Sequence, residues 1–179
     1  RDDEAVLGVV DGGGAIRLTP AEVDMTGSLV VQAADDVRPF RTFLARFSLR
    51  MSGGACGHDG TAETCGAAGA SFVFGPIGSA PFGHEGVGPG LRVCFITGGA
   101  PRVEVRHLHE LLASVPAELR RADHAALVEV SVDAHGLSVR YDGAFQVHNL
   151  TLVDWDPQPS WQFGFGGRTT AAVDEHVLG

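Results

Sequence analysis

The sequence contains no lysine, a single asparagine and a single tyrosine, and its thirteen basic residues are all arginine. Twenty-two acidic residues give the 179-residue chain a formal net charge of −9. This charge would repel a polyphosphate backbone unless the basic residues gathered on one face, and the sequence shows no basic cluster. We therefore expect no nucleic-acid partner.

Long apolar runs are also missing. Apolar residues make up 44% of the chain, but no stretch approaches the roughly 20 apolar residues that a membrane span requires. We therefore expect no membrane insertion. The length predicts a single domain covering residues 1–179. Because no basic and apolar leader precedes it, we expect this domain to be a piece of a longer protein.

Cysteine is scarce, with three residues in the chain. Cys56 and Cys65 bracket a glycine-containing loop, and this spacing favours a disulfide over two free thiols. Cys94, within an apolar run, is interpreted as a buried thiol. No second close Cys or His pair has the spacing of a zinc finger, which argues against a zinc site. The sequon at Asn149 predicts glycosylation only in a secreted eukaryotic protein.

Apolar residues alternate with polar ones in many short segments. Residues 43–51, 102–106 and 126–133 follow this period of two, which is typical of half-buried strands. Asp142-Gly143 between two such runs predicts a hairpin. About a dozen short strands and no repeat or linker indicate one all-β sandwich.

Residues 107–123 leave two interpretations open. Leucines at helical spacing favour a turn or two of helix, but Pro116 interrupts them, and a strand followed by an irregular crossover fits equally well. His107 and His109 would share one strand face and could bind a metal. We expect them instead to be solvent-facing histidines.

Five motifs follow one another in an order that resembles a known superfamily. They are IRLTPAEVDMTGSLVVQ, PFRTFLARFSLRMSGG, GAAGASFVFGP, GHEGVGPGLRVCFIT and WQFGFGGRTTAAVDEH. Together they resemble the concanavalin A-like lectin/glucanase superfamily, in the branch of the legume-type lectin domains, over roughly residues 16–177. The resemblance implies a jelly-roll β-sandwich of two antiparallel sheets. It also implies that Asp174 and His176, near the end, belong to the fold rather than to a metal site.

The sequence departs from this family where calcium-dependent lectins carry acids. Ala68 stands at the position of the aspartate in the family motif GADG, and Ile96 at that of the aspartate in FDT. A hard divalent cation needs oxygen ligands, which alanine and isoleucine side chains do not supply. We therefore expect neither the family's metal site nor any other cofactor.

Catalytic residues are not predicted either. The glucanases of the superfamily use carboxylates at alternate positions of one strand, and the sequence contains no Glu-x-Asp. Glu104, Glu129 and Asp133 are interpreted as solvated strand acids. The chain also lacks the G-x-S-x-G motif of a nucleophile elbow.

The best candidates for ligand binding lie on loops. The resemblance places His58-Asp59 and His84-Glu85 near one rim, together with Gly88, whose backbone amide would contact sugar. Trp155, flanked by acids and prolines, is the aromatic residue most expected to be exposed and to stack on a sugar ring.

These observations predict a non-catalytic recognition module, carbohydrate-binding or adhesive, without the family's calcium site. Its partner would be a glycan or an extracellular protein, in a secreted or cell-surface setting together with other domains of the same chain. The alternative is a structural, protein-interaction domain in an extracellular or ciliary assembly that binds no glycan. A glycan hydrolase is the third and least favoured interpretation.

Overall fold

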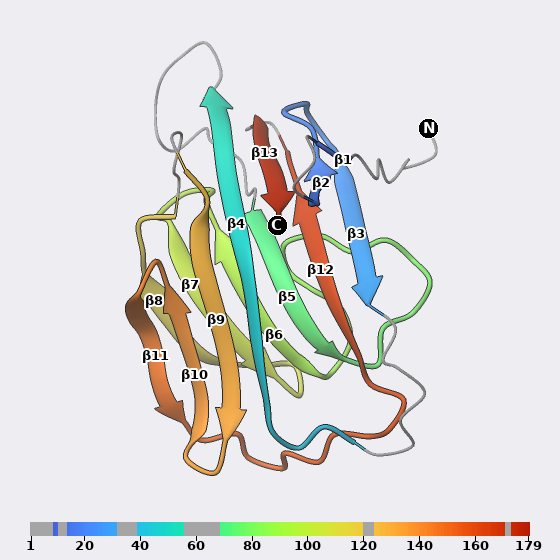
Figure 1. The fold of residues 1–179 in the computed structure, drawn as a ribbon, viewed down its shortest axis with the longest axis vertical. Helices are drawn as coiled ribbons and strands as arrows, with labels where there is room; N and C mark the ends of the chain where they lie inside the picture. The colour runs from blue at the N-terminus through green and yellow to red at the C-terminus, as the bar shows by residue number, and fades with distance from the viewer. Residues whose placement is uncertain (1–8, 11–13, 32–38, 56–68, 120–123, 171–172) are drawn as a thin grey trace.

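The computed structural model describes residues 9–10, 14–31, 39–55, 69–119, 124–170 and 173–179. Within them the chain forms two antiparallel sheets stacked face to face (Figure 1). The seven-stranded sheet has the spatial order β1 (Val9–Val10), β2 (Ala15–Thr19), β13 (Val173–Leu178), β4 (Phe43–Ala55), β9 (Ala126–Asp133), β10 (Gly136–Tyr141) and β11 (Ala144–Leu150). The six-stranded sheet has the order β3 (Thr26–Val31), β12 (Gln162–Arg168), β5 (Gly69–Gly75), β6 (Leu91–Ile96), β7 (Arg102–His107) and β8 (Glu110–Pro116). The expected jelly-roll β-sandwich is confirmed.

The alternation in the sequence sets which side of each strand is buried. In β9 every second residue, from Ala126 to Val132, is buried, and the residues between them are half-buried or exposed. Asp142-Gly143 turns the chain between β10 and β11, and both residues have positive φ, of 52° and 81°. This is the backbone geometry that the sequence predicts for a tight hairpin turn.

Of the two interpretations of residues 107–123, the strand is confirmed over Glu110–Pro116, because these residues form β8. The two histidines do not share a strand face. His107 ends β7 and is only 3% exposed, whereas His109 lies in the turn that follows, with a φ of 68°. The expectation that both face solvent is wrong for His107, whose ring packs 5.7 Å from that of Trp155.

Phenylalanines fill much of the space between the two sheets. Phe72 is 1% exposed, and its ring centroid lies 5.9 Å from that of Phe47 across the sandwich and 5.7 Å from that of Phe165 on the neighbouring strand. Phe74 stacks on Phe163 at 4.5 Å. The Phe47–Phe72 contact joins the two sheets, and the other two contacts pack neighbouring rings of the six-stranded sheet, in the offset or edge-on geometries that aromatic pairs prefer.

Two polar residues of β13, Glu175 and His176, stabilise the fold. The carboxylate of Glu175 forms ion pairs with Arg17 on β2 at 2.9 Å and with Arg50 on β4 at 3.0 Å. It therefore links β13 to both of its neighbouring strands. His176 is fully buried, and its Nδ1 lies 2.6 Å from the hydroxyl of Thr19. For His176 this agrees with the interpretation that the residue belongs to the fold, whereas the side chain of Asp174 lies outside the described part of the structure.

Removal of the Phe72 ring should weaken the sandwich strongly. We expect Phe72→Ala to lower the free energy of unfolding by about 3–5 kcal/mol, since it leaves a cavity between the sheets. The matched control is Phe145→Ala, because Phe145 is 46% exposed. Urea denaturation of the two variants measures the difference, and equal losses would contradict this description of the core.

Candidate functional site

Residues 76–90 connect β5 to β6 and lie over the outer face of the six-stranded sheet; we call them the covering loop. In Figure 1 this green segment extends toward β12 and β3. Phe82 is 5% exposed, and its ring occupies the space above two glycines of β12: a Cβ at Gly164 would lie 3.0 Å from it, and one at Gly166 2.6 Å. Any larger residue at these positions would displace the loop.

A hydrogen bond fixes the loop beside this contact. The hydroxyl of Ser71 on β5 donates to the carbonyl oxygen of Gly83 at 2.7 Å, in a buried position. Further along, a Cβ at Gly86 would lie 3.0 Å from the Arg92 side chain, so the loop backbone also borders β6. The covering loop therefore forms one wall above the strands β5 and β6.

The sheet beside this wall carries a groove of about 240 Å³. We call it the arginine groove, and it is lined by His84, Glu85, Arg92, Cys94, Ile96, Arg102, Glu104 and Arg106. The strand residues among them lie on the outward side of β6 and β7, because their neighbours Val93, Phe95, Val103 and Val105 point into the core. Three of the eight side chains are guanidinium groups, and they are interleaved with the carboxylates of Glu85 and Glu104.

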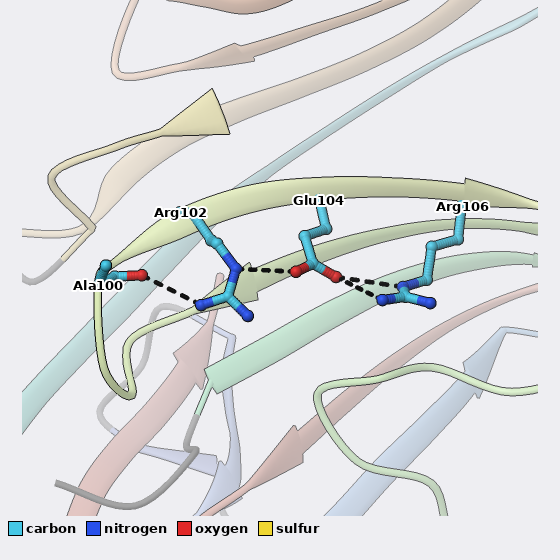
Figure 2. Close-up of polar contacts among 4 residues, drawn as sticks. All are labelled: Ala100, Arg102, Glu104 and Arg106. Atoms are coloured by element: carbon cyan, nitrogen blue, oxygen red, sulfur yellow. Dashed lines mark hydrogen bonds and ion pairs between the residues drawn. The ribbon is translucent and has the colours of Figure 1, made fainter. Parts of the chain in front are cut away.

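Glu104 lies between two of these arginines on β7 (Figure 2). Its Oε1 accepts a hydrogen bond from Arg102 Nε at 2.8 Å, and its Oε2 accepts two from Arg106, at 3.1 Å from Nε and 2.9 Å from Nη2. Arg102 also donates from Nη1 to the carbonyl oxygen of Ala100 at 3.1 Å. The carboxylate thus holds both guanidinium groups against the sheet.

The electrostatic environment keeps Glu104 ionised. The Glu104 side chain is only 7% exposed, and this burial by itself would raise the pKa of its carboxyl group. The hydrogen bonds and positive charges of Arg102 and Arg106 outweigh the effect of burial, so the pKa of Glu104 lies below the ordinary value. Glu104 was interpreted from the sequence as a solvated strand acid, and this is wrong. It is a buried acceptor for two arginines.

Arg92 has no acidic partner among the described residues. It faces Arg106 across the β6–β7 pair, and its Nε is buried without a hydrogen bond. Burial lowers the pKa of Arg92, as does the charge of Arg106, although an arginine remains protonated near neutral pH. Like charges on directly opposed residues destabilise a sheet, so this pair is electrostatically unfavourable as it stands.

His84 and Glu85 project from the covering loop beside Arg168 of β12. Glu85 Oε1 accepts from Arg168 Nη1 at 3.1 Å, and His84 Nδ1 lies 3.3 Å from Glu85 Oε2 without a hydrogen bond. Burial lowers the pKa of His84, the charge of Glu85 opposes this, and the charges of Arg168 and Arg102 add to the lowering. His84 is therefore a neutral imidazole near neutral pH.

Cys94 lies beneath the groove and is 1% exposed, as expected of a buried thiol. Burial raises its pKa to about 12. A nucleophilic cysteine needs a lowered pKa, so this thiol contributes a neutral surface and no reactivity.

The structure brings only part of the predicted site together. His84 and Glu85 line the groove. Gly88 is on the same loop with a φ of 71°, but it lies against Pro76, beyond the end of β5. His58, Asp59, Cys56 and Cys65 lie outside the described residues, as does Ala68.

Trp155 differs from its prediction. It is half-buried, packs against the core, and donates from Nε1 to the carbonyl oxygen of Arg41 at 2.9 Å. Its ring lies 6.0 Å from that of Phe74 and 5.7 Å from that of His107, at the end of the six-stranded sheet opposite Ile96 and Arg102. The expectation of an exposed tryptophan is wrong, because the surrounding acids and prolines of the sequence do not reveal the aromatic neighbours.

Asn149, the residue of the sequon, is exposed near the end of β11 with a φ of 53°. Its backbone N–H donates to the hydroxyl of Ser138 at 3.1 Å. Its side chain is accessible for modification, which stays a prediction.

Sequence reasoning missed the arginines of the groove. The signal was present in RVEVR, residues 102–106, because a period of two places Arg102, Glu104 and Arg106 on one side of a strand. Arg92 joins this group only because the antiparallel register of β6 on β7 places it opposite Arg106, and no local sequence pattern shows that register.

The chain has the fold of the L-type lectin carbohydrate recognition domains. No family profile matches the chain, and no curated protein matches its sequence. Several solved structures share its architecture. The Ca²⁺-bound exoplasmic/lumenal domain of VIP36 is 17% identical with a TM-score of 0.72, and the match covers 92% of this chain and 76% of that chain.

Two further structures show the same similarity. The carbohydrate recognition domain of Emp47p is 14% identical with a TM-score of 0.67, and the match covers 99% of this chain and 86% of that one. The metal-free carbohydrate recognition domain of Emp46p is 12% identical with a TM-score of 0.62, covering 92% and 79%. At these identities the likeness concerns the fold.

The ion pairs of Glu104 can be tested by removing its charge. We expect Glu104→Gln to lower the free energy of unfolding by about 2–3 kcal/mol at pH 7, because two half-buried arginines lose their shared acceptor. The control is Glu110→Gln, in the adjacent strand, where the acid is exposed. Urea denaturation at a series of pH values measures both variants.

The pH dependence has a definite sign. A carboxylate whose pKa is lowered by folding stabilises the protein above its unfolded pKa of about 4.3, and the stabilisation disappears as the pH falls through the lower folded value. The difference between wild type and Glu104→Gln should therefore shrink below about pH 4. A difference independent of pH would contradict the assigned ion pairs.

Proposed function

We propose that this chain is a non-catalytic, glycan-binding module that acts at the arginine groove without calcium. The observation that carries the proposal is the groove itself: polar and charged side chains from β6, β7 and the covering loop converge on one depression, in a fold shared with carbohydrate recognition domains. Glycan sites are concave and use a few fixed polar groups to orient the ligand. Arg102, Arg106 and Glu104 are fixed in this way by their mutual hydrogen bonds.

The described residues around Ile96 do not fit a calcium site. VIP36 is described in a Ca²⁺-bound form and in a metal-free form, which raises the question of a metal here. Ile96, at the position where the family resemblance expects an aspartate, lines the groove beside Arg102. A divalent cation requires several oxygen ligands and would be repelled by the neighbouring guanidinium groups. Hydrogen bonds from fixed side chains would hold the glycan instead.

A hydrolase is disfavoured by the state of the acid in the groove. A general acid for glycoside hydrolysis needs a raised pKa so that it carries a proton near neutral pH. The pKa of Glu104 is lowered, and both of its oxygens are occupied by arginines. Glu129 of β9 is likewise paired, with Arg46 at 2.6 Å.

The setting of the module is part of the same proposal. VIP36 is represented by an exoplasmic/lumenal domain, which supports a location in the secretory pathway or outside the cell. We place the module there as one domain of a longer chain. The described residues contain no helix long and apolar enough to cross a membrane.

A glycan array probed with and without a chelator tests the proposed function. We expect binding that EDTA does not change and that His84→Ala and Arg102→Gln weaken. Arg41→Gln serves as the control, because Arg41 is exposed and lies on the strand-free segment before β4. Binding that disappears with EDTA would contradict the calcium-independent mechanism, and an array without any signal would contradict glycan binding.

A protein-interaction role is the second candidate, and a different face supports it. The outer face of the seven-stranded sheet exposes three large apolar side chains: Leu44 is 54% exposed, Leu127 50% and Phe145 46%. If this face binds protein, Leu127→Ser should abolish complex formation with the partner or with a second copy, measured by light scattering after gel filtration. If wild type is already a monomer without a protein partner, and Leu127→Ser still binds glycan, the protein-interaction role is excluded and the glycan-binding function remains.

A further inference from the structure

We propose that the arginine groove binds a negatively charged sugar through its carboxylate or sulfate group, an inference that rests on the glycan-binding function proposed above. The chain carries a net charge of −9, yet this groove gathers positive charge. Arg92, Arg102 and Arg106 line it together with Glu104, so three cations face one buried anion. The second acid, Glu85, is neutralised by Arg168 outside the groove at 3.1 Å.

The excess positive charge is held in place and is not neutralised by any acid among the described residues. Arg102 and Arg106 are tied to Glu104, and no acidic side chain among the described residues pairs with Arg92. The register places Arg92 directly opposite Arg106, where the Cβ atoms of opposed residues lie about 5 Å apart. An oxyanion between these two guanidinium groups would convert a repulsion into two charge-assisted hydrogen bonds.

Arg92 also offers an unused donor. Its Nε is buried and makes no hydrogen bond, and a buried donor without a partner costs free energy that a bound acceptor recovers. The backbone at Gly86 packs against the Arg92 side chain, so that a Cβ there would lie 3.0 Å from its Cγ and Cδ. The covering loop thus limits where the Arg92 side chain can move.

The remaining surface suits a sugar rather than a bare ion. Ile96 and the neutral thiol of Cys94 give the groove an apolar floor, against which the C–H face of a sugar ring can pack. His84 adds a neutral imidazole at the wall. The volume of about 240 Å³ lies below the roughly 300–1,000 Å³ of sites for drug-sized molecules. It therefore suits one charged sugar residue.

Titration with D-glucuronate, D-glucose and acetate, followed by NMR, tests the inference. We expect glucuronate to bind roughly tenfold or more tightly than either glucose or acetate, since only glucuronate supplies both the ring and the oxyanion. Arg92→Gln should remove most of this preference and leave the protein folded, because Arg92 lacks a partner to lose. The charge-matched control Arg41→Gln should bind like wild type, since Arg41 is exposed and, among the described acids, pairs with Asp156 at 3.2 Å.

Each other result contradicts a defined part of the account. Equal binding of glucose and glucuronate, unchanged in Arg92→Gln, would overturn the anion site and leave the proposed glycan function standing. Acetate binding as tightly as glucuronate would overturn the assignment to a sugar. Failure of all three probes, together with an array that shows no glycan, would overturn both proposals. Thermal unfolding checks each variant: glucuronate should raise the midpoint of wild type and not that of Arg92→Gln.

Discussion

The contact on which the groove depends is that of Phe82 with the glycines of β12. Gly164 and Gly166 leave the outer face of the six-stranded sheet without side chains at two positions, while the alternate residues Phe163 and Phe165 pack into the core. Phe82 occupies the vacant face and brings the covering loop down onto the sheet. The Ser71 hydroxyl then fixes the loop at Gly83. Without this contact His84 and Glu85 would have no fixed position, and the groove would lose one wall.

The electrostatics of the groove follow from three residues of one strand. Glu104 satisfies both Arg102 and Arg106 (Figure 2), and their charges lower its pKa in spite of its burial. This arrangement fixes both guanidinium groups on the outer face of β7. The groove therefore presents fixed cations, with Arg92 supplying a charge that no described acid neutralises. The chemistry of the groove favours anions, although the chain as a whole is acidic.

Much of the fold could be predicted because the period of two is a local property of the sequence. The strand around Val128 and Val130 and the hairpin at Asp142 appear in the structure as the pattern predicts. The order of the motifs suggested the jelly roll, which the solved structures confirm. The site was predicted less well because it depends on pairs distant in sequence. Trp155 is covered by residues from β5 and β7, and Arg92 meets Arg106 only through sheet register.

The central claim is that the glycan contacts the arginine groove. Mapping of NMR chemical shifts during titration with the strongest array ligand tests it most directly, because every arginine Nε–H reports separately on its own surroundings. The account predicts that the shifts concentrate on Arg92, Arg102 and Arg106 and on the amides of the covering loop near His84. Shifts that gather instead on the outer face of the seven-stranded sheet, around Phe145, would contradict it.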